Sequence, residues 1–239
     1  MKLFVTVLAL ALLSVSTRAS DGGRSAEFDY DAPAPGSYTL PVIKAAADGE
    51  LLNADGKPRR LSELTRGRIT VLSFIYTRCA AKRACPYATG VLMEIHRVSA
   101  EDAALAKALR LVSMSFDPEN DTPERMAGFS GLASEFTNAA PWHFMTTRSQ
   151  TELQPILKAY GQAVDKKQNP LDITGPLNHT LRVFLIDGAG NIRNIYSSET
   201  LDLRLVLADV RTLMLEEKRG TSNIQHPTTN IQVALPSDP

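Results

Sequence analysis

The chain has few cysteines, few aromatic residues and no excess of charge of either sign. Of its 239 residues only two are cysteine, Cys79 and Cys85, and 6% are aromatic. Two cysteines are too few for a small secreted scaffold held by several disulfides or for a zinc ribbon with four thiolate ligands. The 26 basic and 26 acidic residues cancel. This balance excludes a strongly basic surface, so we expect no nucleic-acid partner.

A long membrane-spanning run is also missing. The most apolar segment, Leu3–Val15, is shorter than the about 20 residues that a transmembrane helix needs. It follows Lys2 and precedes the small residues of a loose cleavage motif, TRA at 17–19. We therefore predict a signal peptide over residues 1–19 and an exported protein, periplasmic or otherwise extracytoplasmic. The alternative is an uncleaved signal anchor, which would then be the protein's attachment to a membrane.

The rest of the chain contains one region of alternating strand and helix patterns. We predict a flexible leader over residues 20–37, a single domain over 38–217 and a loose tail over 218–239. Within the tail, residues 231–235 are apolar enough to pack as a short extended piece. The domain opens with a predicted hairpin over 51–61, which turns at Asp55-Gly56.

The predicted elements of the domain alternate along the chain. Apolar runs predict strands at 69–76, 111–116, 142–146, 181–186 and 191–196. Apolar residues at helical spacing, preceded by capping residues, predict helices at 87–98, 122–136, 149–160 and 201–218. We expect the first strands to be parallel and the last two to be an antiparallel pair, with helices on both faces of the sheet. This order predicts an α/β fold, a thioredoxin-like sandwich with an N-terminal β-hairpin.

Cys79 and Cys85 lie where the first long predicted strand meets the following helix, the edge at which open α/β sheets bind ligands. Pro86 suits the first turn of that helix, and the helix dipole with Lys82 and Arg83 would favour the thiolate of Cys85. Six helical positions rotate by about 600°, so Cys79 must lie in a loop that folds back toward Cys85. Such a pair can bind a metal, exchange disulfides or form a plain stabilising disulfide.

Three segments of the chain carry a family resemblance. They are FIYTRC…CP at Phe74–Pro86, SFDPENDTPERM at Ser115–Met126 and NHTLRVFLIDGAGNI at Asn178–Ile192. In this order they resemble the SCO/SenC family of thioredoxin-like copper proteins, over a stretch from about Tyr38 to Met214. The segment between the cysteines departs from that family, which normally has three residues there and proline after the first cysteine. Here five residues intervene, Ala80–Ala84.

The resemblance implies a copper site made by Cys79, Cys85 and His179. Two soft thiolates and an imidazole can hold Cu(I), and also Cu(II) with an added oxygen ligand. The family is associated with maturation of the CuA centre of cytochrome c oxidase. The implied partner is therefore the copper-bearing oxidase subunit, or another periplasmic copper or thiol protein.

The remaining histidines and two acidic residues have other expected roles. We expect His96 to be a partly exposed residue near a helix C-terminus, His143 to pack at a strand edge, and His226 to lie in the tail. Asp117 and Asp121 follow a predicted strand at the sulfur end of the sheet. They either support the site as hydrogen-bond acceptors or shape a turn and helix start. Core positions are expected for Phe74, Tyr76, Trp142 and Phe184.

Three functions remain open from the residues and the resemblance together. The first is a non-catalytic copper carrier, a metallochaperone. The second is an extracytoplasmic thiol–disulfide oxidoreductase with Cys79 and Cys85 as its redox pair, although typical redox pairs are two residues apart. The third is a binding module that uses the same face without metal.

Overall fold

The computed structural model describes residues 28–224. The predicted signal peptide over 1–19, the apolar piece at 231–235 and His226 lie outside the described residues. The domain begins at Ala32 rather than at the predicted residue 38. Its first residues are fastened, because the Gly36 amide donates to the Thr212 hydroxyl over 2.9 Å. The end of the predicted flexible leader is therefore part of the domain.

An eight-stranded mixed sheet forms the centre of the domain, with the order β1-β10-β9-β4-β5-β6-β2-β3. A separate two-stranded hairpin pairs β7 with β8. The strands are β1 Lys44–Ala45, β2 Glu50–Asn53, β3 Pro58–Arg60, β4 Ile69–Ile75, β5 Leu109–Ser115, β6 Trp142–Thr146, β7 Val164–Lys166, β8 Leu177–His179, β9 Val183–Ile186 and β10 Asn191–Tyr196. The β4, β5 and β6 strands run parallel, while β9 runs antiparallel to β4.

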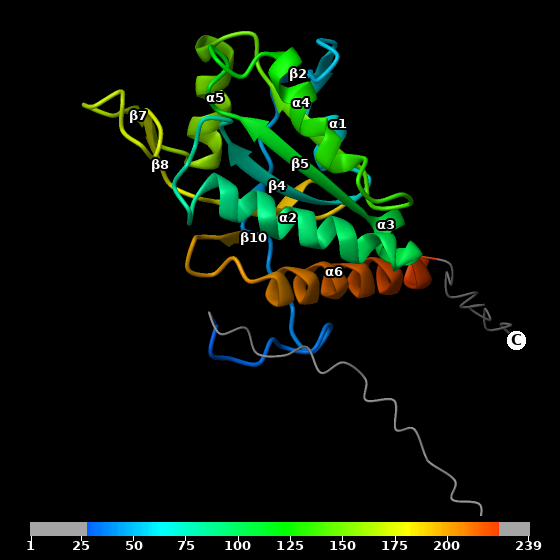
Figure 1. The fold of residues 1–239 in the computed structure, drawn as a ribbon. Helices are drawn as coiled ribbons and strands as arrows, with labels where there is room; N and C mark the ends of the chain where they lie inside the picture. The colour runs from blue at the N-terminus through cyan, green and yellow to red at the C-terminus, as the bar shows by residue number, and fades with distance from the viewer. Residues whose placement is uncertain (1–27, 225–239) are drawn as a thin grey trace, which may run out of the picture. The chain divides into compact units, whose positions relative to one another are not determined.

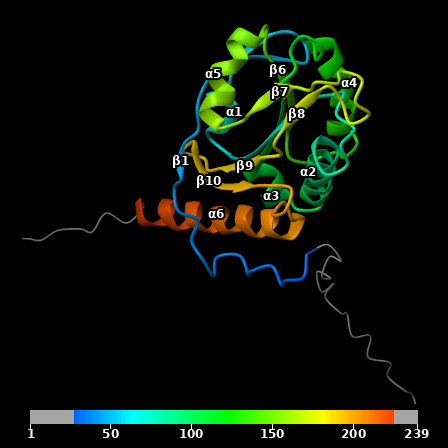
Figure 2. The same ribbon diagram turned by 90° about the vertical axis from the view of Figure 1, so that its left-hand side faces the viewer.

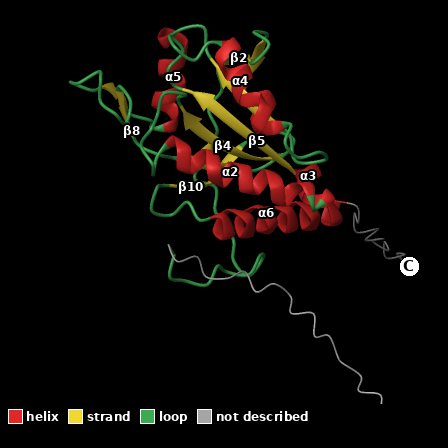
Figure 3. Ribbon diagram, in the orientation of Figure 1, coloured by secondary structure: helices red, strands yellow, loops and turns green. Residues whose placement is uncertain are grey.

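Helices cover both faces of this sheet. They are α1 Leu61–Thr65, α2 Cys85–Ala100, α3 Ala103–Ala108, α4 Pro123–Ala133, α5 Gln150–Tyr160 and α6 Leu203–Ile224. The α2 and α4 helices lie on one face and α1 and α5 on the other (Figures 1 and 2), with the strands between them (Figure 3). The α6 helix packs beside α2. None of the helices in the described range is long and apolar enough to span a membrane.

The central strands are buried because helices shield both of their faces. Every residue of β4 and β9 is buried, which explains their continuous apolar runs. The four predicted core aromatics, Phe74, Tyr76, Trp142 and Phe184, are at most 6% exposed. The N-terminal hairpin is present as β2 and β3, with Gly56 at φ 77° in its turn. Glycine suits this position because it enters the left-handed region without strain.

The predicted helix boundaries hold where capping residues mark them. Thr122 caps α4, and Ser149 and Gly161 bound α5 as expected. The closing helix differs from its prediction. Asp202, not Thr200, accepts from the backbone amide in its first turn, and α6 continues to Ile224. The predicted tail from residue 218 is therefore helical at its start.

Candidate metal centre

The segment that carries Cys79 links β4 to α2 and is called the Cys79 loop here (residues 76–84). It turns back at once, because the Cys79 amide donates to the Tyr76 carbonyl over 3.2 Å. Farther along, the Ala80 amide donates to the Thr174 carbonyl over 3.2 Å. Cys85 is the first residue of α2 and is followed by Pro86, which needs no amide partner in the first helical turn. The loop thus returns Cys79 toward the helix start, as the sequence predicts.

His179 reaches the same place from the β7–β8 hairpin, where it ends β8 and pairs with Val164. This hairpin lies at the same end of the sheet as the start of α2 (Figure 1). The His179 ring packs against two aromatic rings, at centroid distances of 5.4 Å from Tyr76 and 4.9 Å from Phe116. These contacts fix the orientation of the imidazole.

The three side chains converge on one point. The Nε2 atom of His179 lies 3.8 Å from the Cys79 Sγ and 3.3 Å from the Cys85 Sγ. All three donor atoms lie within 4.8 Å of one another. Sulfur and nitrogen ligands that share one first-row metal ion at 2.0–2.3 Å stand about 3.5–4 Å apart. The observed spacing therefore fits a single shared ion.

The two cysteines differ in exposure and in protonation. Both thiols are free; Cys79 is half-buried and Cys85 is 4% exposed. The hydrogen bond from Cys85, followed by that from His179, lowers the pKa of Cys79 to about 4. The same bond to Cys79, together with burial, raises the pKa of Cys85. The two sulfurs thus compete for one negative charge, and the thiolate of Cys85 that the helix dipole favours stays a prediction.

Asp121 holds the Cys79 loop in place. Its carboxylate is fully buried and accepts from the Thr77 amide over 3.0 Å, from the Thr77 hydroxyl over 2.5 Å and from the Ser115 hydroxyl over 2.6 Å. These bonds join the end of β5 to the segment that leads into Cys79. Asp121 is therefore a positioning residue, and the helix cap next to it is Thr122 alone.

Asp117 has a similar role one step farther along the loop. It accepts from the Arg78 guanidinium over 2.9 Å and from the Asn120 side-chain amide over 2.9 Å. Arg78 directly precedes Cys79, so this ion pair also restrains the loop. Of the two expectations for these acidic residues, support of the site is the one that their contacts favour.

The other histidines lie away from this cluster. The expectation for His96 was wrong: it is 1% exposed and packs between Phe136 and Trp142, and burial lowers its pKa. His143 is half-buried in β6, where burial and the nearby Arg110 lower its pKa to about 4. In the described part of the chain, the side chains that could jointly hold a metal ion are Cys79, Cys85 and His179.

Sequence reasoning missed three residues that shape the centre. Tyr76 was assigned only to the core, but its ring contacts His179 and its hydroxyl donates to the Thr174 carbonyl over 3.4 Å. Phe116 and Thr77 were not assigned a role. The position of Thr77 two residues before Cys79 is a usable signal, whereas nothing in the sequence connects Phe116 with a histidine so far along the chain.

Comparisons with known proteins agree on one family. The SCO1/SenC family model matches residues 44–215. The SCO1 protein homolog of Bacillus subtilis (strain 168) is 28% identical over 163 residues, covering 67% of this chain and 78% of that protein.

Two solved structures share the fold. The copper-bound ScoI of Arabidopsis thaliana is 21% identical with a TM-score of 0.60, covering 72% of this chain and 99% of that one. A SCO1/SenC family lipoprotein from Bacillus anthracis str. Ames is 24% identical with a TM-score of 0.61, covering 74% and 99%. The predicted thioredoxin-like fold is thereby confirmed.

Proposed function

Because the chain belongs to the SCO1/SenC family, we propose that it is an exported copper-binding protein that delivers copper to the CuA site of cytochrome c oxidase. The observation that carries the proposal is the convergence of Cys79, Cys85 and His179 within 4.8 Å. Copper is the cargo of such a protein rather than a resident cofactor. The Arabidopsis relative, whose structure contains copper, supports the choice of metal.

The donor set suits copper and argues against a closed structural zinc site. Thiolates select soft ions such as Cu(I), whereas structural zinc sites are almost always closed by four protein ligands. The described residues supply three ligands at this point. A three-ligand site can hold Cu(I) and leaves a position through which a ligand of the acceptor can enter.

The burial of the two sulfurs suggests the direction of transfer. Cys85 is enclosed, while Cys79 is half-buried on the loop side. An acceptor thiolate would therefore approach past Cys79, displace it from copper and draw the ion outward. The half-buried thiolate is the ligand that an incoming group can reach without unfolding α2.

The copper site is tested by titrating Cu(I) into the reduced full chain. We expect one equivalent to bind, with affinity reduced at least 100-fold in Cys79→Ser, Cys85→Ser and His179→Ala because each removes one of three ligands. The control is His143→Ala, which changes a half-buried histidine outside the cluster and should bind like the unchanged chain. Copper binding that is indifferent to His179→Ala would contradict the proposal.

Delivery and export need separate measurements. Copper-loaded chain mixed with the reduced, copper-free CuA domain of the oxidase should transfer copper to it, measured as the copper content of the separated domain, and the His179→Ala chain should not. Export is supported by the N-terminal apolar run and the TRA motif at 17–19. It predicts that the cellular protein is extracytoplasmic, with a mature N-terminus at Ser20 if the signal is cleaved.

The thiol–disulfide oxidoreductase is the second candidate. The observation that favours it is that two free thiols lie next to one another, one of them reachable, in a thioredoxin-like fold. In that case the copper-free chain would reduce a disulfide of the CuA domain, His179→Ala would retain that activity, and Cys79→Ser would lose it. Retention of activity in His179→Ala separates this role from copper delivery.

A further inference from the structure

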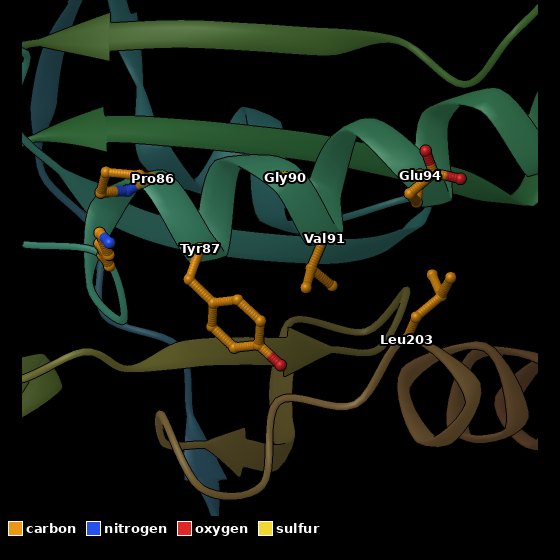
Figure 4. Close-up of a pocket in the computed structure, with 7 residues that line it drawn as sticks. Pro86, Tyr87, Gly90, Val91, Glu94 and Leu203 are labelled. Carbon is orange, nitrogen blue, oxygen red and sulfur yellow. The ribbon is translucent and has the colours of Figure 1, made fainter. Parts of the chain in front are cut away.

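A hollow of about 390 Å³ lies beside the Cys79 loop, between α2 and the start of α6. Its lining residues are Lys82, Pro86, Tyr87, Gly90, Val91, Glu94 and Leu203. Figure 4 shows Val91 and Leu203 facing one another across it, with Pro86 and Glu94 toward opposite ends. Two of its lining residues, Lys82 and Pro86, flank Cys85 in the sequence, so the hollow lies beside the start of α2. Any protein that approaches the two cysteines from this side meets it.

Gly90 keeps the middle of the hollow open. It lies inside α2, where glycine destabilises a helix relative to alanine. A Cβ atom added at Gly90 would meet nothing within 4 Å. Neither packing nor backbone conformation therefore requires glycine at this position, and its effect is to leave space above Tyr87 and Val91.

The wall formed by Tyr87 is fixed. Its hydroxyl donates to the Leu201 carbonyl over 2.6 Å, which ties α2 to the segment leading into α6. The Arg83 guanidinium lies 5.3 Å from the centre of the Tyr87 ring and donates to the Ser198 carbonyl over 2.7 Å. The hollow is consequently preformed, which lowers the entropy cost of filling it.

The charges around the hollow are arranged unevenly. Lys82, at the end nearest the cysteines, is exposed and makes no ion pair within the described range. Glu94, at the other end, accepts from the Arg97 guanidinium over 3.0 Å and is already paired. The unpaired charge is therefore positive and lies on the copper side of an apolar depression.

We propose that this hollow is the docking site for the client, and that it accepts a large apolar side chain of the client, with an acidic residue beside it that faces Lys82. The proposal rests on the proposed copper delivery and names how the acceptor is recognised. Interface energy concentrates where a large side chain fills a preformed pocket, surrounded by contacts that exclude water. A segment anchored here would hold an acceptor thiolate close to Cys79 while copper changes ligands.

The test fills the hollow without touching a copper ligand. We expect Gly90→Ala and Gly90→Leu to slow copper transfer to the reduced CuA domain progressively, by about 3-fold and at least 10-fold, while the thermal midpoint stays the same or rises. The matched controls are Gly128→Ala and Gly128→Leu in α4, where an added Cβ also meets nothing within 4 Å. These should transfer copper within 2-fold of the unchanged chain. Lys82→Glu should slow transfer and make the remaining rate less sensitive to salt.

Further readouts separate the possible failures. Copper stoichiometry and transfer to a small Cu(I) chelator need no docking and should be unchanged in Gly90→Leu. If the unchanged chain gives no copper to the CuA domain, the proposed function is wrong and the docking proposal that rests on it falls with it. If it does, and Gly90→Leu transfers at the same rate, the docking proposal is wrong. It is also wrong if Gly90→Leu alters only self-association in sedimentation, since the hollow would then be a contact between copies of this chain.

Discussion

Two buried carboxylates fasten distant segments of this domain, and only one of them lies next to a metal-binding geometry. Asp121 accepts three hydrogen bonds, from Thr77 twice and from Ser115. Asp209 in α6 is 1% exposed and also accepts three, from Tyr38, Asn194 and Tyr196. The first joins the end of β5 to the Cys79 loop. The second joins β10 and the entry segment to α6.

The two regions differ in what each carboxylate holds in place. Around Asp209 the neighbouring side chains direct their polar groups at the carboxylate itself, so the cluster is closed. Around Asp121 the fastened loop presents Cys79 to Cys85 and His179, whose donor atoms face one another. A buried polar cluster therefore indicates a metal site when it holds metal-ligating atoms around one shared point. Its role is structural when its polar groups hydrogen-bond only to one another.

Asp121→Ala should have the largest effect, because it should lower both the stability of the fold and the affinity for copper. Two partly buried donors at Thr77 and the buried Ser115 hydroxyl would lose their acceptor, at a cost of about 4 kcal/mol in the free energy of unfolding. Copper affinity should also fall at least 10-fold, because the loop no longer holds Cys79 in position. Urea unfolding and Cu(I) competition measure the two effects. Asp121→Asn keeps an acceptor oxygen and should lose less of both.

Asp209→Ala should lower the stability of the fold without affecting the copper site. We expect a loss of about 3 kcal/mol in the free energy of unfolding, since the buried Tyr196 hydroxyl and the partly buried Asn194 amide would be unpaired. Copper affinity, measured without urea so that the chain is folded, should stay within 2-fold of that of the unchanged chain. A large loss of copper affinity in Asp209→Ala would show that the two regions are coupled, against the contrast drawn here.

The sequence alone predicts the long elements of the fold well. Continuous apolar runs predicted β4 and β5, and capping residues such as Thr122 and Ser149 marked helix starts. The short elements α1, α3, β1, β7 and β8 were missed, because a few residues carry no resolvable period. The end of α6 was misplaced because charged residues from 218 onward look like a tail, although a helix tolerates them on its solvent side.

The convergence of three side chains could be predicted from the sequence, but the way the fold brings them together could not. Cys79, Cys85 and His179 were singled out, but the hairpin that carries His179 is short and polar, so its pairing with β7 is a tertiary effect. The sequence shows the helix dipole and the nearby cations that favour a Cys85 thiolate, but not the close approach of the two sulfurs, which makes them compete for one negative charge. The bonds of Asp121 to Thr77 span a distance along the chain that no local pattern encodes.

The mildest test removes one of the hydroxyl groups that donate to each carboxylate. Thr77→Val and Tyr196→Phe are close in shape to the original residues and delete one donor to Asp121 and Asp209, respectively. Each should lower the free energy of unfolding by about 1 kcal/mol, because each carboxylate keeps its other two hydrogen bonds. Copper affinity should fall a few-fold in Thr77→Val, since the remaining amide bond restrains the loop less, and should not change in Tyr196→Phe. Equal copper affinities in the two variants would mean that the backbone turn at Tyr76 positions Cys79 without help from the Thr77 hydroxyl.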